Sequence, residues 1–288
     1  MKRTVATIAL VVLLLVGTGI VGYPFISNYL MEQNLSSEVQ SYLDSTALLD
    51  NSKFDEEFEK AKEYNESLIG NVSIGDPFGY QPVADDNYYD LLNVQGTSVM
   101  AALEIPAINI TYPIYHGADE SILSKGIGHL RNTSLPIGGE CTHSVLTGHT
   151  GTSQAKLFTD LDKLERDDVF YITVLGDTLA YKVDQIKVVL PSDTSDLRVE
   201  PDKDYVTLVT CTPYGVNSHR LLVRGSRIPY TREEMKKLNA SRKAAQSTWV
   251  NEYLSAIIIG AVVMVSILIV YALFRVISKK IRKRKDND

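Results

Sequence analysis

Short runs of apolar and β-branched residues follow one another between residues 99 and 228, and turn residues separate them. Runs of this length predict β-strands, and many short strands at such spacing are typical of a β-barrel or a β-sandwich. We expect seven or eight strands, with runs at 99–105, 108–115, 144–147, 169–174, 179–189, 205–210 and 220–228. The fold class is therefore mostly β.

A helical pattern precedes this β-rich region. Residues 34–68 are charged, and Phe54, Phe58, Ala61 and Leu68 fall on one helical face. This spacing predicts an amphipathic helix that packs on the β domain or stands off a membrane.

Two further stretches have helical patterns. Residues 155–164 place three leucines on one face, which predicts a short helix inside the β-rich region. Residues 231–249 are polar, and Thr231 with Glu234 fits a capping box at the start of a helix.

Uncharged apolar stretches lie near both ends of the chain, at 4–21 and 253–274, and each is long enough to cross a bilayer as a helix. Lys2 and Arg3 precede the first stretch, and a cluster of lysines and arginines follows the second. Positive residues favour the cytoplasmic side, so we expect both termini in the cytoplasm and the middle outside the cell membrane. A cleaved signal peptide is the alternative for the first stretch, but its long apolar run favours a retained anchor.

Composition narrows the function classes. The 288 residues are 44% hydrophobic and 22% charged, which allows one large domain with appendages. The net charge is −6 although both ends are basic, so the middle is acidic and nucleic acid is not an expected partner. No HExxH, CxxC or glycine-rich phosphate loop occurs in the sequence, and we expect no metal or other cofactor.

Candidate chemistry gathers around residues 205–227. Cys211 ends one predicted strand and Arg220 begins the next, so a thiol nucleophile and a cationic donor for an oxyanion can face the same space. This arrangement suits acyl transfer, which also needs a base. The simpler interpretation is a small buried cysteine and a solvated arginine.

His149 has the best context for that base, because a predicted strand leads into its glycine-flanked loop. His219 competes with it because it lies next to Arg220. An exported chain can also pair its only two cysteines, Cys141 and Cys211, and such a disulfide would block the nucleophile.

Residues 70–95 read as a long loop, and long loops in compact domains are often lids, binding loops or linkers. Within it, Asp76, Pro77 and Phe78 place an acid and an aromatic ring on either side of a residue with a fixed φ angle. The alternative is a plain turn.

The sequence TLVTCTPYGVNSHRLLVRG at 207–225 resembles the active-site signature of the class C, or pilin-polymerising, sortases. The resemblance runs in one order from about residue 76 to 230 and includes further motifs, namely IP at 105–106, PIYHG at 113–117, GIGHL at 126–130, SLPIGG at 134–139, THSVLTGH at 142–149 and KLFTDL at 156–161. It implies a sortase-type eight-stranded β-barrel with short helices, an N-terminal helical region and a transmembrane helix at each end.

The resemblance also implies a membrane-anchored cysteine transpeptidase. Its substrates would be secreted pilins or surface proteins with an LPxTG-like sorting motif, cut between Thr and Gly and transferred from a thioester to a pilin lysine. The implied residues are Cys211 as nucleophile, His149 as acid/base, Arg220 as oxyanion or substrate-positioning cation, Thr210 as a substrate contact, and Asp76, Pro77 and Phe78 as a lid over the empty site.

Two positions depart from the family pattern, because Thr150 stands where an arginine is common and Cys141 where a cysteine is unusual. Three alternatives stay open: a sortase of another class that attaches proteins to a peptidoglycan precursor, a hydrolytic cysteine peptidase, and a membrane-tethered binding domain without activity. The expected layout is an anchor or signal segment at 1–24, a helical extracellular stalk at 25–69, a lid-bearing loop at 70–96, the catalytic barrel at 97–230, a polar helix at 231–252, a transmembrane helix at 253–274 and a basic tail at 275–288.

Overall fold

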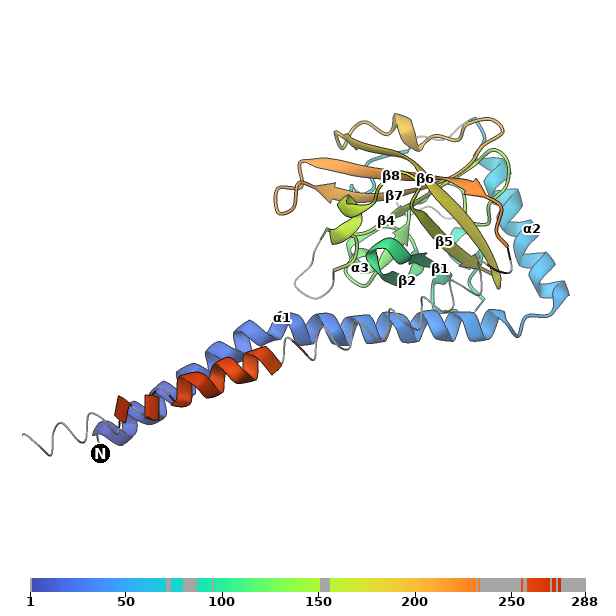
Figure 1. The fold of residues 1–288 in the computed structure, drawn as a ribbon. Coiled ribbons are helices and arrows are strands. Elements are labelled where there is room, and N and C mark those ends of the chain that lie inside the picture. Colours follow the sequence, from blue (N-terminus) through green and yellow to red (C-terminus); the bar gives the residue numbers. More distant parts are fainter. Residues whose placement is uncertain are drawn as a thin grey trace, which may run out of the picture. The chain divides into compact units, whose positions relative to one another are not determined.

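A computed structural model describes residues 2–70, 74–79, 87–94, 96–150, 156–231 and 233, together with 255, 258–269, 271–272 and 274–275 near the C-terminus (Figure 1). The chain forms two compact units, Met1–Leu238 and Asn239–Asp288, and each is described by itself.

The centre of the first unit is a closed β-barrel with the strand order β1-β2-β3-β4-β7-β8-β6-β5. Its strands are β1 (Val99–Ile105), β2 (Ile110–His116), β3 (Ile127–His129), β4 (Thr142–Thr147), β5 (Val169–Val174), β6 (Asp177–Val189), β7 (Asp204–Thr212) and β8 (His219–Ile228). The prediction of a mostly β fold with an eight-stranded barrel is confirmed.

Two strand pairs in the barrel run parallel, β2 with β3 and β4 with β7, and the others run antiparallel. The register of the second parallel pair joins Thr142 to Asp204 and Thr147 to Val209. Because parallel strands end at the same edge of a sheet, the segments that follow β4 and β7 arrive side by side.

The sequence pattern missed β3 and misplaced the start of β2. Three residues are too few to show the alternation that predicts a strand. The predicted start of β2 at Ile108 lies in a 3₁₀ turn, η2 (Pro106–Ile108), and Asn109 has a positive φ of 55° that ends this turn. β2 therefore begins at Ile110.

The helix predicted at 155–164 is wrong over its described residues, 156–164. Only a 3₁₀ turn, η3 (Thr159–Lys163), forms there, because Leu157 pairs with Thr150 in a β-bridge and the chain enters the segment extended. Phe158, Leu161 and Leu164 are buried at a spacing of three. That is the repeat of a 3₁₀ helix, in which side chains at i and i+3 eclipse.

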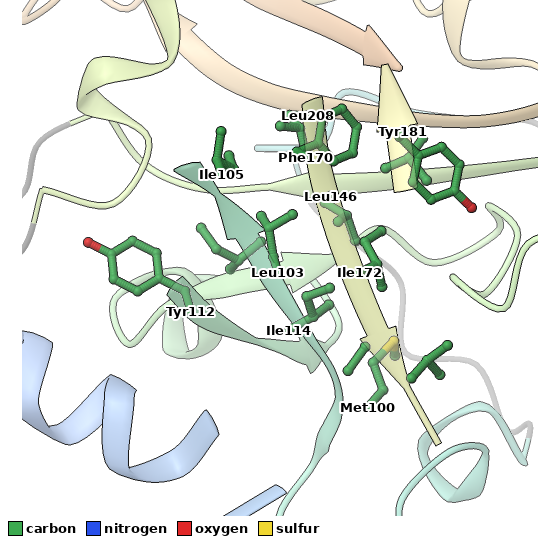
Figure 2. Packing of buried hydrophobic residues seen from close by; sticks show 14 of the residues in the cluster. Met100, Leu103, Ile105, Tyr112, Ile114, Leu146, Phe170, Ile172, Tyr181 and Leu208 are labelled. Carbon is green, nitrogen blue, oxygen red and sulfur yellow. The ribbon is translucent and has the colours of Figure 1, made fainter. Parts of the chain in front are cut away.

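Apolar side chains fill the interior of the barrel, where Leu103, Ile114, Phe170 and Leu208 come from four different strands (Figure 2). Every residue of β1 is buried, because its outer face is covered as well. Ala102 of that face packs in a cluster with Val39 and Tyr42 of the N-terminal helix. The barrel and the N-terminal helix therefore share one continuous packing interface.

Two α-helices precede the barrel in the part of the chain that the structure describes, α1 (Lys2–Thr46) and α2 (Asn51–Ser67). The helical conformation ends after Thr46 and resumes at Asn51. The Asp50 side chain caps α2 by accepting a hydrogen bond from the backbone N–H of Lys53. The Tyr42 hydroxyl donates to the carbonyl oxygen of Met100 at 2.8 Å. The Asn65 amide bonds both backbone groups of Leu135, accepting at 2.6 Å and donating at 3.2 Å. Both helices pack on the barrel, the first of the two alternatives for 34–68.

The remaining short elements of the first unit are η1 (Asn87–Asp90), α3 (Glu120–Leu123) and η4 (Ser195–Leu197).

Among the described residues, one helix is long and apolar enough to cross a membrane, over Val11–Thr46. In the second unit, Ile258–Ile269 form a shorter apolar helix, and the rest of the predicted span at 253–274 is only partly described. A membrane span at each end is not shown. The polar helix predicted at 231–249, its Glu234 and the basic tail lie outside the described residues, apart from a few isolated positions.

Candidate active site

Cys211 and Arg220 lie directly opposite each other on neighbouring strands. The antiparallel register of β7 and β8 pairs them, so their side chains leave the same face of the sheet. Both residues are 8% exposed. The predicted thiol and guanidinium are therefore brought together.

His149 reaches the same edge because it follows β4, which runs parallel to β7. The Gly148 N–H donates to the Val209 carbonyl oxygen at 3.1 Å and fixes this approach. Gly148 is required for it, since a Cβ atom there would lie 2.6 Å from Ile127 and 2.9 Å from Phe158. The His149 ring contacts the Glu120 carboxylate through Nε2 at 3.2 Å.

The segment 74–79 lies over these groups. Arg220 donates two hydrogen bonds to the Asp76 carboxylate, from Nε and from Nη2, each at 2.8 Å. The Phe78 ring centre lies 5.0 Å from the Arg220 guanidinium and 5.6 Å from the His149 ring. Pro77 joins the two contacts. The Asp76 carboxylate on Arg220 and the Phe78 ring near both Arg220 and His149 together cover the site of Cys211.

A second anchor of this segment was missed from the sequence. The Thr194 hydroxyl, in the connection between β6 and β7, donates to the Ile74 carbonyl oxygen at 2.9 Å. Ile74 and Phe78 pack against a small apolar cluster that includes Val209 and Leu222. A lone threonine in a loop carries no sequence signal for such a contact.

Opposing influences act on the Cys211 thiol. Burial raises its pKa above the ordinary value and is the main cause; the Arg220 guanidinium lowers the pKa, and the Asp76 carboxylate raises it. The same carboxylate, by accepting hydrogen bonds, raises the pKa of Arg220. With the segment in place, the thiol is therefore held towards its protonated form.

Thr210 lies on the opposite face of β7 from Cys211, because neighbouring residues of a strand alternate in direction. It is 2% exposed, and its hydroxyl donates to the Gly148 carbonyl oxygen at 2.7 Å. Its hydroxyl oxygen also lies 2.7 Å from that of Thr150. The predicted contact of Thr210 with substrate stays a prediction.

The other histidines have different surroundings. His116, His129 and His143 are buried, and burial lowers their pKa values, to about 3 for His129 and about 4 for His143. His219 is opposite Thr212 on β7 and hydrogen-bonds Ser218 at 2.9 Å. By strand alternation it leaves the opposite face from Arg220.

The two cysteines are free, so the disulfide alternative is excluded. Cys141 precedes Thr142, which pairs with Asp204 at the start of β7, and Cys211 lies near the end of that strand. At about 3.3 Å per strand residue, the two are roughly 20 Å apart, far beyond the reach of a disulfide. In the part of the chain that the structure describes, no cluster of His, Cys, Asp or Glu could hold a metal ion.

Comparisons with known proteins identify the family to which this fold belongs. The sortase domain family matches residues 103–228. Sortase D of Bacillus subtilis is 32% identical over 129 residues, which are 44% of this chain but only 62% of that protein. Sortase A of Bacillus anthracis is 23% identical over 224 residues, 78% of this chain and 95% of that protein. The chain belongs to the sortase family of cysteine transpeptidases.

Its structural neighbours are class C sortases. Sortase C1 of GBS Pilus Island 1 is 44% identical with a TM-score of 0.64, covering 69% of this chain and 94% of that chain. Sortase C-1 of Actinomyces oris is 49% identical with a TM-score of 0.58, covering 61% and 99%. Streptococcus pneumoniae Sortase C, described with "pilin substrate specificity", is 42% identical with a TM-score of 0.64, covering 68% and 98%.

Proposed function

We propose that this chain polymerises pilins at the cell surface. It cleaves an LPxTG-like sorting motif between Thr and Gly and transfers the Thr acyl group to a lysine amine of a pilin subunit. One observation carries the proposal: Cys211 and Arg220 share a strand register, and both lie beneath a segment that presents Asp76 and Phe78. The likeness to class C sortases supports it.

In this mechanism, the Cys211 thiol gives its proton to His149, its sulfur attacks the carbonyl carbon of the sorting-motif Thr, and Arg220 stabilises the negative oxygen that forms. The C–N bond to Gly then breaks, and His149 gives its proton to the departing amine. A thioester on Cys211 remains. The lysine amine attacks the thioester, the C–S bond breaks, and His149 takes up the proton that the new amide loses.

The segment with Asp76, Pro77 and Phe78 acts as a lid. Asp76 is hydrogen-bonded to the Arg220 guanidinium, which would otherwise face the substrate oxygen. Phe78 lies between Arg220 and His149. The lid has to move before a sorting motif can reach Cys211. The apolar part of α1 anchors the enzyme in the membrane, and the barrel faces the outside.

The test is acylation by a sorting-motif peptide, read by mass spectrometry on the full chain and on a chain with Asp76→Ala and Phe78→Ala. We expect an acyl group on Cys211 and none after Cys211→Ala, with the melting temperature preserved. An acyl group on Cys141, or on neither cysteine, contradicts the assignment. With a pilin substrate, a ladder of covalent multimers supports the proposal, and a single product linked to a peptidoglycan precursor supports a sortase of another class.

A further inference from the structure

Two threonine hydroxyls lie between the His149 loop and β7. The oxygens of Thr150 and Thr210 are 2.7 Å apart. Thr210 donates to the Gly148 carbonyl oxygen at 2.7 Å, and Thr150 donates to the Cys211 carbonyl oxygen. Together they form a hydroxyl pair that connects the two chain segments.

A count of protons explains how the pair is satisfied. Each hydroxyl has one proton and two lone pairs. The Thr210 proton goes to Gly148 and the Thr150 proton goes to Cys211, so the contact between the two hydroxyl oxygens requires one of these protons to be shared. Both acceptors are peptide groups of the site: the Gly148 carbonyl belongs to the peptide bond that leads into His149, and the other carbonyl belongs to Cys211 itself.

The rest of the His149 backbone is held as well. Its carbonyl oxygen accepts from the Phe158 N–H at 3.1 Å, and Thr150 pairs with Leu157 in a β-bridge. The ring is held less firmly. Its carboxylate partner Glu120 has a side chain that is 82% exposed, and its aromatic neighbour Phe78 belongs to the lid.

Lid opening therefore removes a ring contact but leaves the hydroxyl pair in place. Proton transfer from His149 to the leaving amine needs the imidazole at a fixed distance from the thioester carbon, and a misplacement of about 1 Å can cost ~100-fold in rate. Among the described residues, the hydrogen bonds that tie the His149 loop to β7 without using the lid include those of the hydroxyl pair and that of Gly148 with Val209.

We propose that Thr150 and Thr210 are positioning residues that fix the separation of His149 and Cys211 during turnover. The proposal rests on the proposed roles of these two residues as acid/base and nucleophile. It assigns the Thr210 hydroxyl to the protein interior instead of to the substrate.

The competing explanation is that buried hydroxyls merely satisfy buried carbonyls, as most buried polar groups do. That explanation predicts a loss of stability and no specific loss of catalysis. The chain offers a matched control, because the hydroxyl oxygens of Thr173 and Thr178 lie 3.1 Å apart across β5 and β6, away from the site. Thr173 is 5% exposed.

The experiment compares Thr150→Val, Thr150→Ser and Thr173→Val in the full chain that also carries Asp76→Ala and Phe78→Ala. Peptide cleavage gives kcat and KM, and melting gives stability. We expect Thr150→Val to lower kcat by ~10- to 100-fold with KM changed less than ~3-fold. Thr150→Ser restores kcat to within ~3-fold of the parent, and Thr173→Val leaves kcat unchanged while lowering the melting temperature.

Two outcomes overturn the proposal: parental kcat in Thr150→Val, or a raised KM at unchanged kcat, which would make the pair a substrate contact. If Thr150→Val does not fold, Thr150→Ala against Thr150→Ser gives the same comparison without added bulk. If the parent chain cleaves no peptide, the proposed function fails, and the alkylation rate of Cys211 against pH still tests the pair. A displaced imidazole then raises the pH midpoint in Thr150→Val but not in Thr150→Ser; an unchanged midpoint in both overturns the proposal.

Discussion

At the scale of single residues, the proposed lid would link access to Cys211 with the ionisation of its thiol. Asp76 neutralises Arg220, the group that lowers the pKa of Cys211, and its own charge raises that pKa. In the proposed mechanism, a closed lid shields the thiol and also disfavours the nucleophilic thiolate, and opening it would remove both effects together.

Asp76→Asn tests this electrostatic part of the lid. The substitution removes a negative charge and keeps the size of the side chain, so the Cys211 pKa falls and more thiolate is present at neutral pH. We expect the pH profile of Cys211 alkylation to move to lower pH and the rate at pH 7.5 to rise ~3- to 10-fold, since one pKa unit is a tenfold change in ionised fraction well below the pKa.

Asp184→Asn is the matched control, because Asp184 accepts two hydrogen bonds from Arg224 on the same strand β8, at 3.0 and 3.1 Å. We expect no change in Cys211 alkylation there. An unchanged profile in Asp76→Asn would show that the lid acts by obstruction alone.

The sequence allowed the Cys211–Arg220 pair to be predicted, because one residue ends a strand and the other begins the next. The Thr150–Thr210 contact could not be predicted, since it joins segments 60 residues apart through two small hydroxyls. The direction of the Thr210 side chain follows only from the alternation along β7, once the strand boundaries are known.

At the scale of elements, the Asn65 side chain makes the buried hydrogen bonds that hold α2 on the barrel. The buried Asn65 amide serves both backbone groups of Leu135, and Ala61 one turn earlier belongs to the barrel core. A helix that only stood off the membrane would have no such contacts. The N-terminal helices are thus part of the folded barrel unit.

Asn65→Ala should destabilise the fold by about 1–3 kcal/mol, because it leaves a buried N–H and a buried C=O without their partner. Chemical denaturation followed by near-UV circular dichroism measures this loss. Glu63→Ala, on the exposed side of the same helix, is the control and should change stability little. Equal stability of both variants would contradict a docked α2.

The prediction of element boundaries was wrong where the local backbone follows neither the helix period nor the strand period. The burial of Phe158, Leu161 and Leu164 repeats every three residues, which fits neither an α-helix nor a strand. Leucine spacing alone could not separate a 3₁₀ turn from a helix, since both bury one face. The β-bridge between Leu157 and Thr150 determines that a 3₁₀ turn forms instead of a helix, and this bridge is a tertiary contact.

At the scale of the whole molecule, buried neutral histidines make the barrel sensitive to acid. Burial lowers the pKa of His129 to about 3 and that of His143 to about 4, from an unfolded value near 6.5. The unfolded chain therefore binds more protons between these values, and the stability that is fully present above pH 6.5 is lost as the pH falls.

We expect the free energy of unfolding to drop by about 2 kcal/mol per buried histidine between pH 7 and pH 5. Urea unfolding at the two pH values measures the drop. His143→Gln should remove the contribution of one histidine from this pH dependence, whereas His219→Gln, at a partly exposed strand start, serves as the control. A stability that is level across this range would show that the histidines titrate normally in the fold.

The number of predicted strands and the family resemblance together predict a closed barrel. They do not predict the order in which its strands pair. The parallel pairing of β4 with β7 joins strands that are separated along the chain by β5 and β6, so no local sequence pattern predicts it. Yet that pairing is what delivers His149 to Cys211. Such long-range pairings depend on the whole core.

The pairing of Thr142 with Asp204 has a practical consequence for every labelling experiment. It leaves the half-buried Cys141 at the far end of the sheet that carries Cys211, out of reach of lid, guanidinium and imidazole. This second thiol is a built-in reference. The ratio of adducts on the two cysteines in one digest corrects for reagent decay and protein loss, and a change confined to Cys211 reports on the site alone.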